Sequence, residues 1–579
     1  MKKSMFLFGA VLAAGLLTTA CSSDENSSEE QSIANKFDAQ GNAYVNIAIN
    51  TPSTRATRAN EVYDDGIAAE YDVKDAVLVL FNGLSTNEDA ATFVSASTMD
   101  NHVAEGSSNV RISDKILFTQ QINKGHANLA GASGLLAFLV VNHNDKFEVA
   151  TDHSLKINGT GFSGTFGELK ALTLNVIGNT TTGLLMTNAP MSSNPGKTND
   201  PTGATITWLT EIKATDIYNS EADAYNGTNI VDIFVERAAA KVDVTATSAS
   251  GTLIDGTVTY NKNGIKWSIE NYNTNYYIER HLSNYYFSSS SENLPTASKP
   301  NYRFADSQPV ETGFTLYRTY WAEDPNMNAA PDNTTSQQLK QPDVSEWNAI
   351  TGVQYIAENT VDQNSLKQEY TTRVILAVPF NSGNDFYTTS WSGADVIVSS
   401  GDIAASALAF VKTLPKYSEW KTAHSTLDIT AVTITNHATN GSAQISGLTP
   451  SDGSSDVSEI LTEAQSKSQM SYFKDGMAYY KVLIKHFGDD ETPLPATVTG
   501  TGYNDIYGSA EANRIRDFLG RYSVVRNNWY NIDLTGIKHI GKPSVPEIPT
   551  DTPDDEIDSY LKVRINVLSW AKRTQSVQL

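Results

Sequence analysis

The residue best placed for chemistry is Cys21, the one cysteine among 579 residues. It follows two lysines, an apolar stretch from Met5 to Leu17, and the small residues at 18–20. A basic start, a short apolar stretch and small residues before a cleavage point are typical of an export signal. We therefore expect residues 1–20 to be a lipoprotein signal peptide and Cys21 to carry lipid.

Two arginines offer a second kind of chemistry, cleavage of the chain itself. Arg55 and Arg58 lie in residues 54–60, a polar stretch without an apolar period. Such a stretch is expected to be an exposed loop, the kind of segment that proteases cut. Either arginine would serve an arginine-specific protease, so the cut stays open between the two. Residues 21–58 would leave as a propeptide that contains the lipid anchor and an acidic, serine-rich tether.

Residues for catalysis or metal binding form no recognised pattern. The nine histidines are dispersed, with no HExxH motif. Gly159–Gly164 formally fits the dinucleotide pattern GxGxxG, but no long buried strand precedes it, as such a site requires. Asp551, Asp554, Asp555, Glu556 and Asp558 lack the glycine and final glutamate of an EF-hand. We expect no enzyme, no cofactor and no metal.

Two segments near the two ends of the chain share one alternation. Residues 45–49 read Val-Asn-Ile-Ala-Ile, and residues 563–567 read Val-Arg-Ile-Asn-Val. Successive side chains of a strand point to opposite faces, so each segment would turn three β-branched side chains to one face of a sheet. Either segment could fill the same groove. Because the arginine loop follows the first segment, a chain that loses this strand could polymerise through the second.

Charge and hydropathy limit the partners of the chain. The net charge is −23, from 42 Lys and Arg against 65 Asp and Glu. Such an acidic surface repels phosphate backbones, which argues against nucleic acid as a partner. After the signal, no apolar stretch approaches the roughly 20 residues that cross a membrane as a helix. Any membrane attachment is therefore expected through lipid on the precursor.

Short alternating segments separated by Asn-, Ser- and Gly-rich stretches predict a mainly β protein. The length exceeds what one core usually serves, so about two domains are expected. Alternation on both sides of the small residues at 238–240 places their boundary there, with an N-terminal β domain at 59–240 and a C-terminal β domain at 241–541. Residues 542–559 are rich in Pro and Asp and predict an extended linker with a reach of about 50 Å. Residues 560–579 then carry the terminal strand.

The C-terminal stretches at 522–532, 537–543 and 560–570, with the linker between them, resemble the Mfa-type fimbria major subunits, type V pilins of Bacteroides-like bacteria. The signal with Cys21, the arginine loop and residues Val235–Val242 resemble the same family. Residues 245–470 have no such match and are expected to hold insertions.

This resemblance implies two β-sandwich-like (transthyretin-like) domains with a C-terminal extended donor-strand arm. It implies a structural subunit of a fimbrial shaft, exported as a lipoprotein and cut at Arg55 or Arg58. Removal of the first strand, with Val45, Ile47 and Ile49, would open a groove that a neighbour fills by donor-strand exchange. The donor residues carried over from the family are Leu561, Val563, Ile565 and Val567.

The resemblance also implies partners and a location. The partners are copies of the chain, fimbrial anchor and tip subunits, an arginine-specific protease, and host or bacterial surface receptors that serve adhesion and biofilm formation. The precursor would be lipid-anchored in the outer membrane and then enter a fimbrium on the cell surface. Alternatives are an anchor or tip subunit and a glycan-binding outer-membrane surface lipoprotein. A secreted glycosidase is supported only by the abundance of acidic residues.

Overall fold

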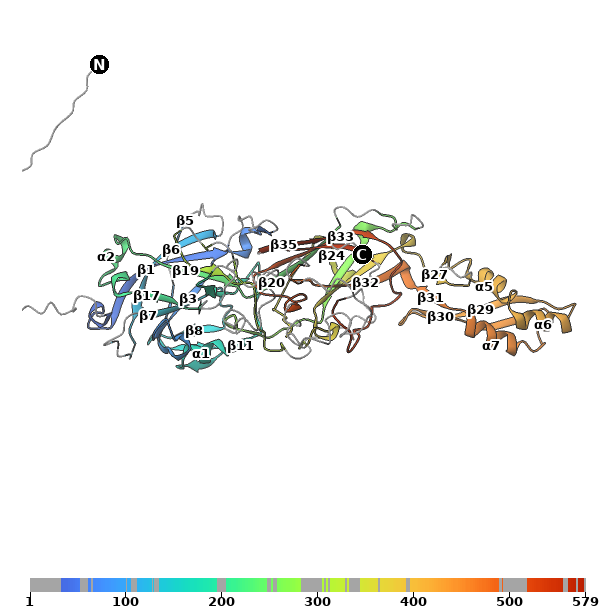
Figure 1. The fold of residues 1–579 in the computed structure, drawn as a ribbon, viewed down its shortest axis with the longest axis horizontal. Helices are drawn as coiled ribbons and strands as arrows, with labels where there is room; N and C mark the ends of the chain where they lie inside the picture. The colour runs from blue at the N-terminus through green and yellow to red at the C-terminus, as the bar shows by residue number, and fades with distance from the viewer. Residues whose placement is uncertain are drawn as a thin grey trace, which may run out of the picture.

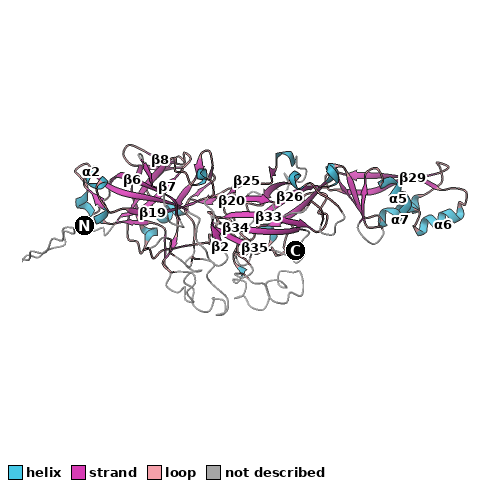
Figure 2. Cartoon of the chain, turned by 90° about the horizontal axis from the view of Figure 1, so that it is seen from above, coloured by secondary structure: helices cyan, strands magenta, loops and turns pink. Residues whose placement is uncertain are grey.

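A computed structural model describes residues 33–52, 61–63, 66–99, 102–105, 112–125, 127, 129, 135–194, 205–246, 251–253, 258–282, 305–306, 309–310, 313–327, 331–332, 344–362, 365–391, 396–488, 492, 518–555, 561–568 and 571–576. The chain is elongated, with three parts in a row (Figure 1). An N-terminal domain occupies one end, a middle domain contains the C-terminal strands, and a distal module with three helices forms the other end (Figures 1 and 2).

The N-terminal domain is built on a sheet in the order β4-β3-β7-β14-β19-β1-β6-β5. Its strands are β1 (Asn42–Pro52), β3 (Ala76–Asn82), β4 (Thr92–Thr98), β5 (His102–Glu105), β6 (Ile112–Asn123), β7 (Leu135–Val141), β14 (Met186–Asn188) and β19 (Val231–Arg237), with β17 (Thr210–Ile212) and β18 (Ile217–Tyr218) attached.

Strands β3 and β7 are buried on both faces, which explains their continuous apolar sequences. Leu78 and Leu139 face one core, which also holds the apolar residues of β1. Val79 and Phe138 face a second core. That second core includes Trp321 from the other half of the sequence, so the N-terminal and middle domains share buried apolar surface.

Short elements cover the sheet and join the domains. They are α1 (Phe166–Lys170), α2 (Glu221–Tyr225), β8 (Phe147–Val149), β9 (Leu155–Ile157), β10 (Thr160–Phe162), β11 (Thr173–Leu174), β12 (Gly178–Asn179), β13 (Gly183–Leu184), β15 (Met191–Ser192), β16 (Ile206–Thr207), β22 (Tyr276–Tyr277) and β23 (Tyr317–Arg318). The GxGxxG segment lies around β10, where Thr160–Phe162 pairs antiparallel with β9. The segment thus consists mainly of a hairpin strand, and the residues before it form the short β9 instead of the long buried strand that a dinucleotide site requires.

The middle domain has two sheets around one core. The first sheet runs β2-β35-β34-β33-β20-β25, and the second runs β24-β21-β26-β32. Their bounds are β2 (Glu61–Tyr63), β20 (Ala240–Thr245), β21 (Lys266–Glu270), β24 (Asn348–Ala349), β25 (Val353–Ile356), β26 (Arg373–Pro379), β32 (Met477–Leu483), β33 (Trp529–Ile537), β34 (Leu561–Leu568) and β35 (Ala571–Ser576). Trp267 and Leu376 of the second sheet and Ile532 of the first lie in this core.

The distal module is inserted into a hairpin of the middle domain. Strands β26 and β32 pair from Arg373↔Leu483 to Pro379↔Met477, and the module lies between them in sequence. It contains β27 (Phe386–Thr389), β28 (Val396–Ser399), β29 (Ile429–His437), β30 (Ser442–Pro450), β31 (Met470–Phe473), α5 (Ile403–Val411), α6 (Pro415–Ala423) and α7 (Ser458–Lys467), with a core of its own. The rings of Phe386 and Phe473 stack at its base, 4.5 Å apart.

The mainly β architecture expected from the sequence is confirmed, but the extended arm is not. Described linker residues 542–555 pack along the middle domain: Val545 is buried beside Ile375, and the Arg373 guanidinium donates to the Pro546 carbonyl over 2.6 Å. Described linker side chains and carbonyls thus find partners on the domain, instead of forming a free arm. Among the described residues, no helix is long and apolar enough to cross a membrane.

Candidate functional site

Strand β1 lies inside its sheet, between β19 and β6. It runs parallel to β19 (Ile47↔Val231, Ile49↔Ile233) and antiparallel to β6 (Ile47↔Phe118). The inward set expected from the alternation, Val45, Ile47 and Ile49, is buried, each residue being 0% exposed. Ala43, two residues before Val45, is also 0% exposed and lies in the same core. Because β1 has a strand on both sides, its removal would leave a gap between β19 and β6 inside the sheet, called the β1 slot below, and would not merely shorten the sheet at its edge.

The outward face of β1 makes polar contacts. The Asn46 amide donates to the Ala224 carbonyl of α2, and the Thr119 hydroxyl donates to Asn46 Oδ1 over 2.9 Å. Asn50 donates to Asp232 Oδ1 of β19 over 3.0 Å. All side chains that β1 contributes to these bonds are neutral.

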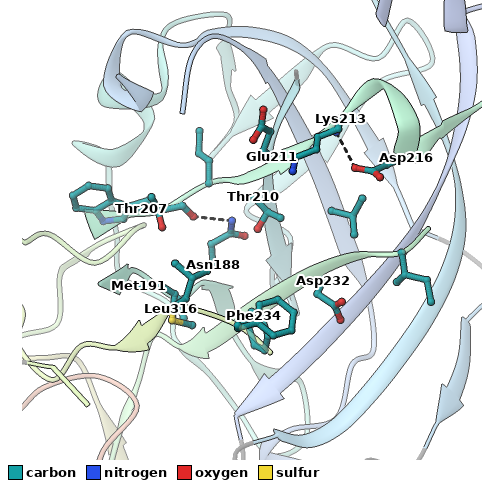
Figure 3. A pocket seen from close by; sticks show the side chains of 16 residues that line it. Asn188, Met191, Thr207, Thr210, Glu211, Lys213, Asp216, Asp232, Phe234 and Leu316 are labelled. Atoms are coloured by element: carbon teal, nitrogen blue, oxygen red, sulfur yellow. Dashed lines mark hydrogen bonds between the residues drawn. The ribbon is translucent and has the colours of Figure 1, made fainter. Parts of the chain in front are cut away.

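Two cavities lie near β1, and a β1 residue lines the first of them. One, of about 510 Å³, is lined by Tyr44, by residues of β4 and β6, by His153 and by Glu221 of α2. The other, of about 470 Å³, lies along β19 and is lined by Asp232, Phe234 and the carboxylates of Glu211 and Asp216 (Figure 3).

The terminal strand β34 pairs within its own chain, antiparallel to β33. The register places Leu561, Val563, Ile565 and Val567 opposite Ile537, Leu534, Ile532 and Tyr530, respectively. Those four partners are each 0% exposed and belong to the middle core. Residues directly opposite in an antiparallel pair lie on the same face, so the register agrees with the face expected for the donor set.

The segment that follows the arginine loop closes the same sheet. Strand β2 pairs antiparallel with β35 (Glu61↔Arg573, Val62↔Lys572), and β35 in turn pairs with β34. In sequence, Arg55 and Arg58 therefore lie between β1 of the N-terminal domain and β2, the edge strand that flanks the terminal hairpin.

A buried charge network joins this region to the domain junction. Glu70 is 1% exposed, and its carboxylate accepts from Lys241 Nζ over 2.8 Å and from the Tyr355 hydroxyl over 2.6 Å. Arg237 donates to the Glu70 carbonyl over 2.6 Å. Burial alone would raise the pKa of Glu70, but Lys241 and Tyr355 outweigh burial and lower it. The chain is thus fixed on the C-terminal side of the loop.

The predicted processing residues lie outside the described part of the chain. These are Cys21, Arg55 and Arg58, together with the signal and the tether. Two of the linker carboxylates have cationic partners: Asp551 lies 2.7 Å from Lys367, and Asp555 pairs with Arg521. Glu556 and Asp558 lie outside the described residues. Within the described ranges, no group of three or more His, Cys, Asp or Glu side chains could hold a metal.

Sequence reasoning missed three parts of this site. Glu221, Asp232 and Glu70 carry no local signal, because their surroundings come from distant segments: Asp232 and Glu70 meet Asn50 and Lys241, and Glu221 lines a cavity with residues of β4 and β6. The alternation in the sequence predicted that β1 has an outward polar face. It did not predict the cavities near that face.

Comparison with known proteins identifies the C-terminal region. Residues 498–576, which include β33, β34 and β35, match the family described as "Major fimbrial subunit protein type IV, Fimbrillin, C-terminal". The predicted resemblance to fimbrial subunits is thereby confirmed at the level of a fimbrial subunit family. No curated protein matches the chain.

Three solved structures cover much of the chain at low similarity. The fimbrilin fimA from Porphyromonas gingivalis W83 is 14% identical, with a TM-score of 0.35, over 92% of this chain and 98% of that one. The tip fimbrial protein Mfa3 from Porphyromonas gingivalis is 10% identical, with a TM-score of 0.27, over 91% and 100%. A fimbrial assembly protein from Parabacteroides distasonis is 10% identical, with a TM-score of 0.26, over 58% and 82%. We therefore rely on the family match over residues 498–576 and draw no conclusion from these three structures.

Proposed function

We propose that this fimbrial subunit is a structural pilin of the shaft, which polymerises when a neighbour's terminal strand replaces its own β1. The observation that carries the proposal is the equivalence of two strands. The buried set Ala43, Val45, Ile47 and Ile49 has the spacing of the terminal set Leu561, Val563, Ile565 and Val567. One set fills an inner slot of the N-terminal domain, and the other can fill that slot in the next copy.

Burial of the donor set is large enough to hold subunits together. Fully burying an aliphatic side chain of this size contributes about 1.5–3 kcal/mol, so four give roughly 6–12 kcal/mol before ordering costs. Backbone pairing along both sides of the slot adds to this, as in other cases of strand addition. The joint would be non-covalent and slow to dissociate.

A single cut can prepare both surfaces. Cleavage at Arg55 or Arg58 separates β1 from β2, so β1 can leave with the anchor. The same cut makes β2 a chain end, and β2 is the edge strand on the terminal hairpin β34–β35. The new N-terminal segment of the processed chain would stay attached to the middle domain through Glu70, whose carboxylate pairs with Lys241 of β20.

The precursor would reach the cell surface through lipid on Cys21 and lose that lipid with the propeptide. In the fimbrium, the subunit would contact other copies and, at the ends, anchor and tip subunits. The presence of β34 favours the shaft over an accessory subunit, because a donor strand serves a subunit that extends the fibre. Adhesion to host or bacterial receptors and biofilm formation would follow from the fibre.

Electron microscopy of purified protein before and after treatment with an arginine-specific protease tests the proposal. We expect fibres after treatment and dispersed particles before it. The double variant Arg55→Ala/Arg58→Ala is the control, because it keeps β1 in place and should stay monomeric under the same treatment. Monomers from the treated wild type, or fibres from the double variant, would overturn the mechanism. Dispersed monomers that bind glycans would instead favour a surface lipoprotein that captures sugars.

A further inference from the structure

The terminal segment differs in charge from the rest of the chain. Residues 560–579 contain Lys562, Arg564, Lys572 and Arg573 and no Asp or Glu, a net charge of +4. Residues 59–240 contain ten Lys and Arg against 22 Asp and Glu, a net charge of −12. Opposite charges on two associating surfaces speed their encounter and disfavour wrong partners. The donor and acceptor are therefore complementary in charge as well as in apolar pattern.

The apolar match fixes which donor residues face outward. With Leu561, Val563, Ile565 and Val567 in the places of Ala43, Val45, Ile47 and Ile49, all four inward positions are filled by apolar side chains. In that register, Lys562 takes the place of Tyr44, Arg564 that of Asn46, and Asn566 that of Ala48. Neutral side chains of the precursor are thus replaced by two cations and an amide.

The surroundings of the outward positions suit those replacements. Tyr44 and Glu221 line one cavity of about 510 Å³, which leaves room for a lysine ammonium beside the carboxylate. Asn46 already donates to the Ala224 carbonyl near the end of α2, and an arginine has more donors for the same acceptor. Asp232 stands opposite Ala48 in the register with β19, where the amide of Asn566 can donate to it.

We propose that the outward face of the β1 slot is a charge-selective docking surface for the basic terminal strand of a second copy. Glu221 receives Lys562, and the Ala224 carbonyl receives Arg564. This assignment rests on the proposed strand exchange and adds to it the residues that set register and rate. In the precursor, the β1 residue that lines the cavity with Glu221 is the neutral Tyr44. The Glu221 carboxylate would form an ion pair only when Lys562 of the donor strand takes the place of Tyr44.

The proposal is tested by the rate of fibre growth after protease treatment of full-length protein, followed by polymer laddering on gels run without boiling. The variants are Glu221→Gln, Glu221→Lys, Lys562→Glu, and Glu221→Lys combined with Lys562→Glu. In about 0.01 M salt, where the Debye length is about 30 Å, we expect Glu221→Gln to slow growth about two- to fivefold. The two reversals should slow growth more, and the combined variant should recover to near the wild-type rate. These differences should shrink in about 1 M salt, where the Debye length is about 3 Å.

Asp72→Lys is the matched control, because Asp72 is exposed and lines neither cavity beside β1. It should leave the rate near that of the wild type. The melting temperature of the unprocessed Glu221→Gln precursor should also be unchanged, because the neutral Tyr44 forms no ion pair with the Glu221 carboxylate. A purely structural role for Glu221 would lower that temperature.

The outcomes separate the two proposals. If treated wild-type protein forms no fibres, the strand exchange itself fails. If it forms fibres but Glu221→Gln and Glu221→Lys grow at the wild-type rate, or the combined variant is no faster than its single variants, only the docking surface is overturned.

Discussion

Glu70 and Lys241 form an ion pair of 2.8 Å in which the two side chains are 1% and 4% exposed. Glu70 lies twelve residues after Arg58, and Lys241 lies in β20 of the middle domain. The Lys241 ammonium also lies 3.5 Å from the centre of the Trp529 ring of β33. One pair of charges thus connects the segment behind the processing loop to the sheet that contains the terminal strand.

Breaking this pair should destabilise the folded chain. Lys241→Met leaves the Glu70 carboxylate buried with less compensation, and removing one partner of a buried pair costs about 3–5 kcal/mol. A clear fall in the melting temperature is expected. The exposed pair of Lys416 and Glu419 is the control, since solvent screens that pair and Lys416→Met should change the melting temperature far less. Equal losses at the two sites would show that the Glu70 network does not stabilise the junction.

The Glu70 pair should also make the junction sensitive to acid. Its partners lower the pKa of Glu70 below the ordinary value of 4.5, so their stabilising effect is fully present above that value. The effect is lost as the pH falls through the lowered pKa of the folded chain. Acid unfolding curves of wild type and Lys241→Met should therefore converge at low pH. Curves that stay equally far apart across the acid range would contradict this linkage.

Glu279 should act in the opposite direction. It is 0% exposed, and burial raises its pKa to about 8, against the opposing effect of Arg526. Between pH 4.5 and about 8 the folded chain keeps a proton that the unfolded chain releases, so stability falls as the pH rises. One such proton contributes a slope of at most about 1.4 kcal/mol per pH unit. Chemical denaturation at several pH values should show a smaller slope for Glu279→Gln, and an unchanged slope would contradict the assignment.

The donor strand should tolerate changes on one face far better than on the other. Ile565→Asp places a carboxylate on the apolar face, where burying an unpaired charge costs several kcal/mol. It should nearly abolish laddering, while Lys562→Ala only slows it. Because Ile565 also lies opposite Ile532 within its own chain, circular dichroism of both precursors must accompany the laddering assay. Equal assembly defects in two folded precursors would mean that the facing is misassigned.

Much of the strand content was accessible from the sequence, because it rests on local patterns. The alternating segment at 45–49 lies in β1, and the one at 563–567 lies in β34. The alternation also identified the buried face of β1. These features depend on side-chain periodicity along a few residues, which the sequence shows directly.

What the sequence did not reveal depends on contacts between distant segments. Helices α5 and α7 lie within residues 245–470, where insertions were expected, but neither the helices nor a separate core of the distal module was predicted. The linker was expected to be extended because composition gives no sign that Val545 would pack on Ile375. Asn46 of β1 donates to the Ala224 carbonyl of α2, which lies 178 residues away in the sequence.

A disulfide between β2 and β35 should hold the donor hairpin in its own subunit. Val62 and Lys572 stand directly opposite each other in an antiparallel pair, and opposite residues have Cα atoms about 4.5–5.5 Å apart, within the range that a disulfide spans. The pair Val62→Cys/Lys572→Cys would be introduced with Cys21→Ser, so that no other thiol competes. The single variant Val62→Cys in the same background is the control.

In the oxidised double variant, the protease should still cut the arginine loop, but β34 should stay paired with β33 because its flanking strand is locked to β2. Few fibres are expected until a reductant is added, after which growth should resume at the rate of the single variant. The bond joins residues on the same side of the cut, so it does not prevent loss of β1. An oxidised variant that polymerises as fast as the reduced one would show that β2 does not restrain the donor. The cut would then act on the acceptor slot alone.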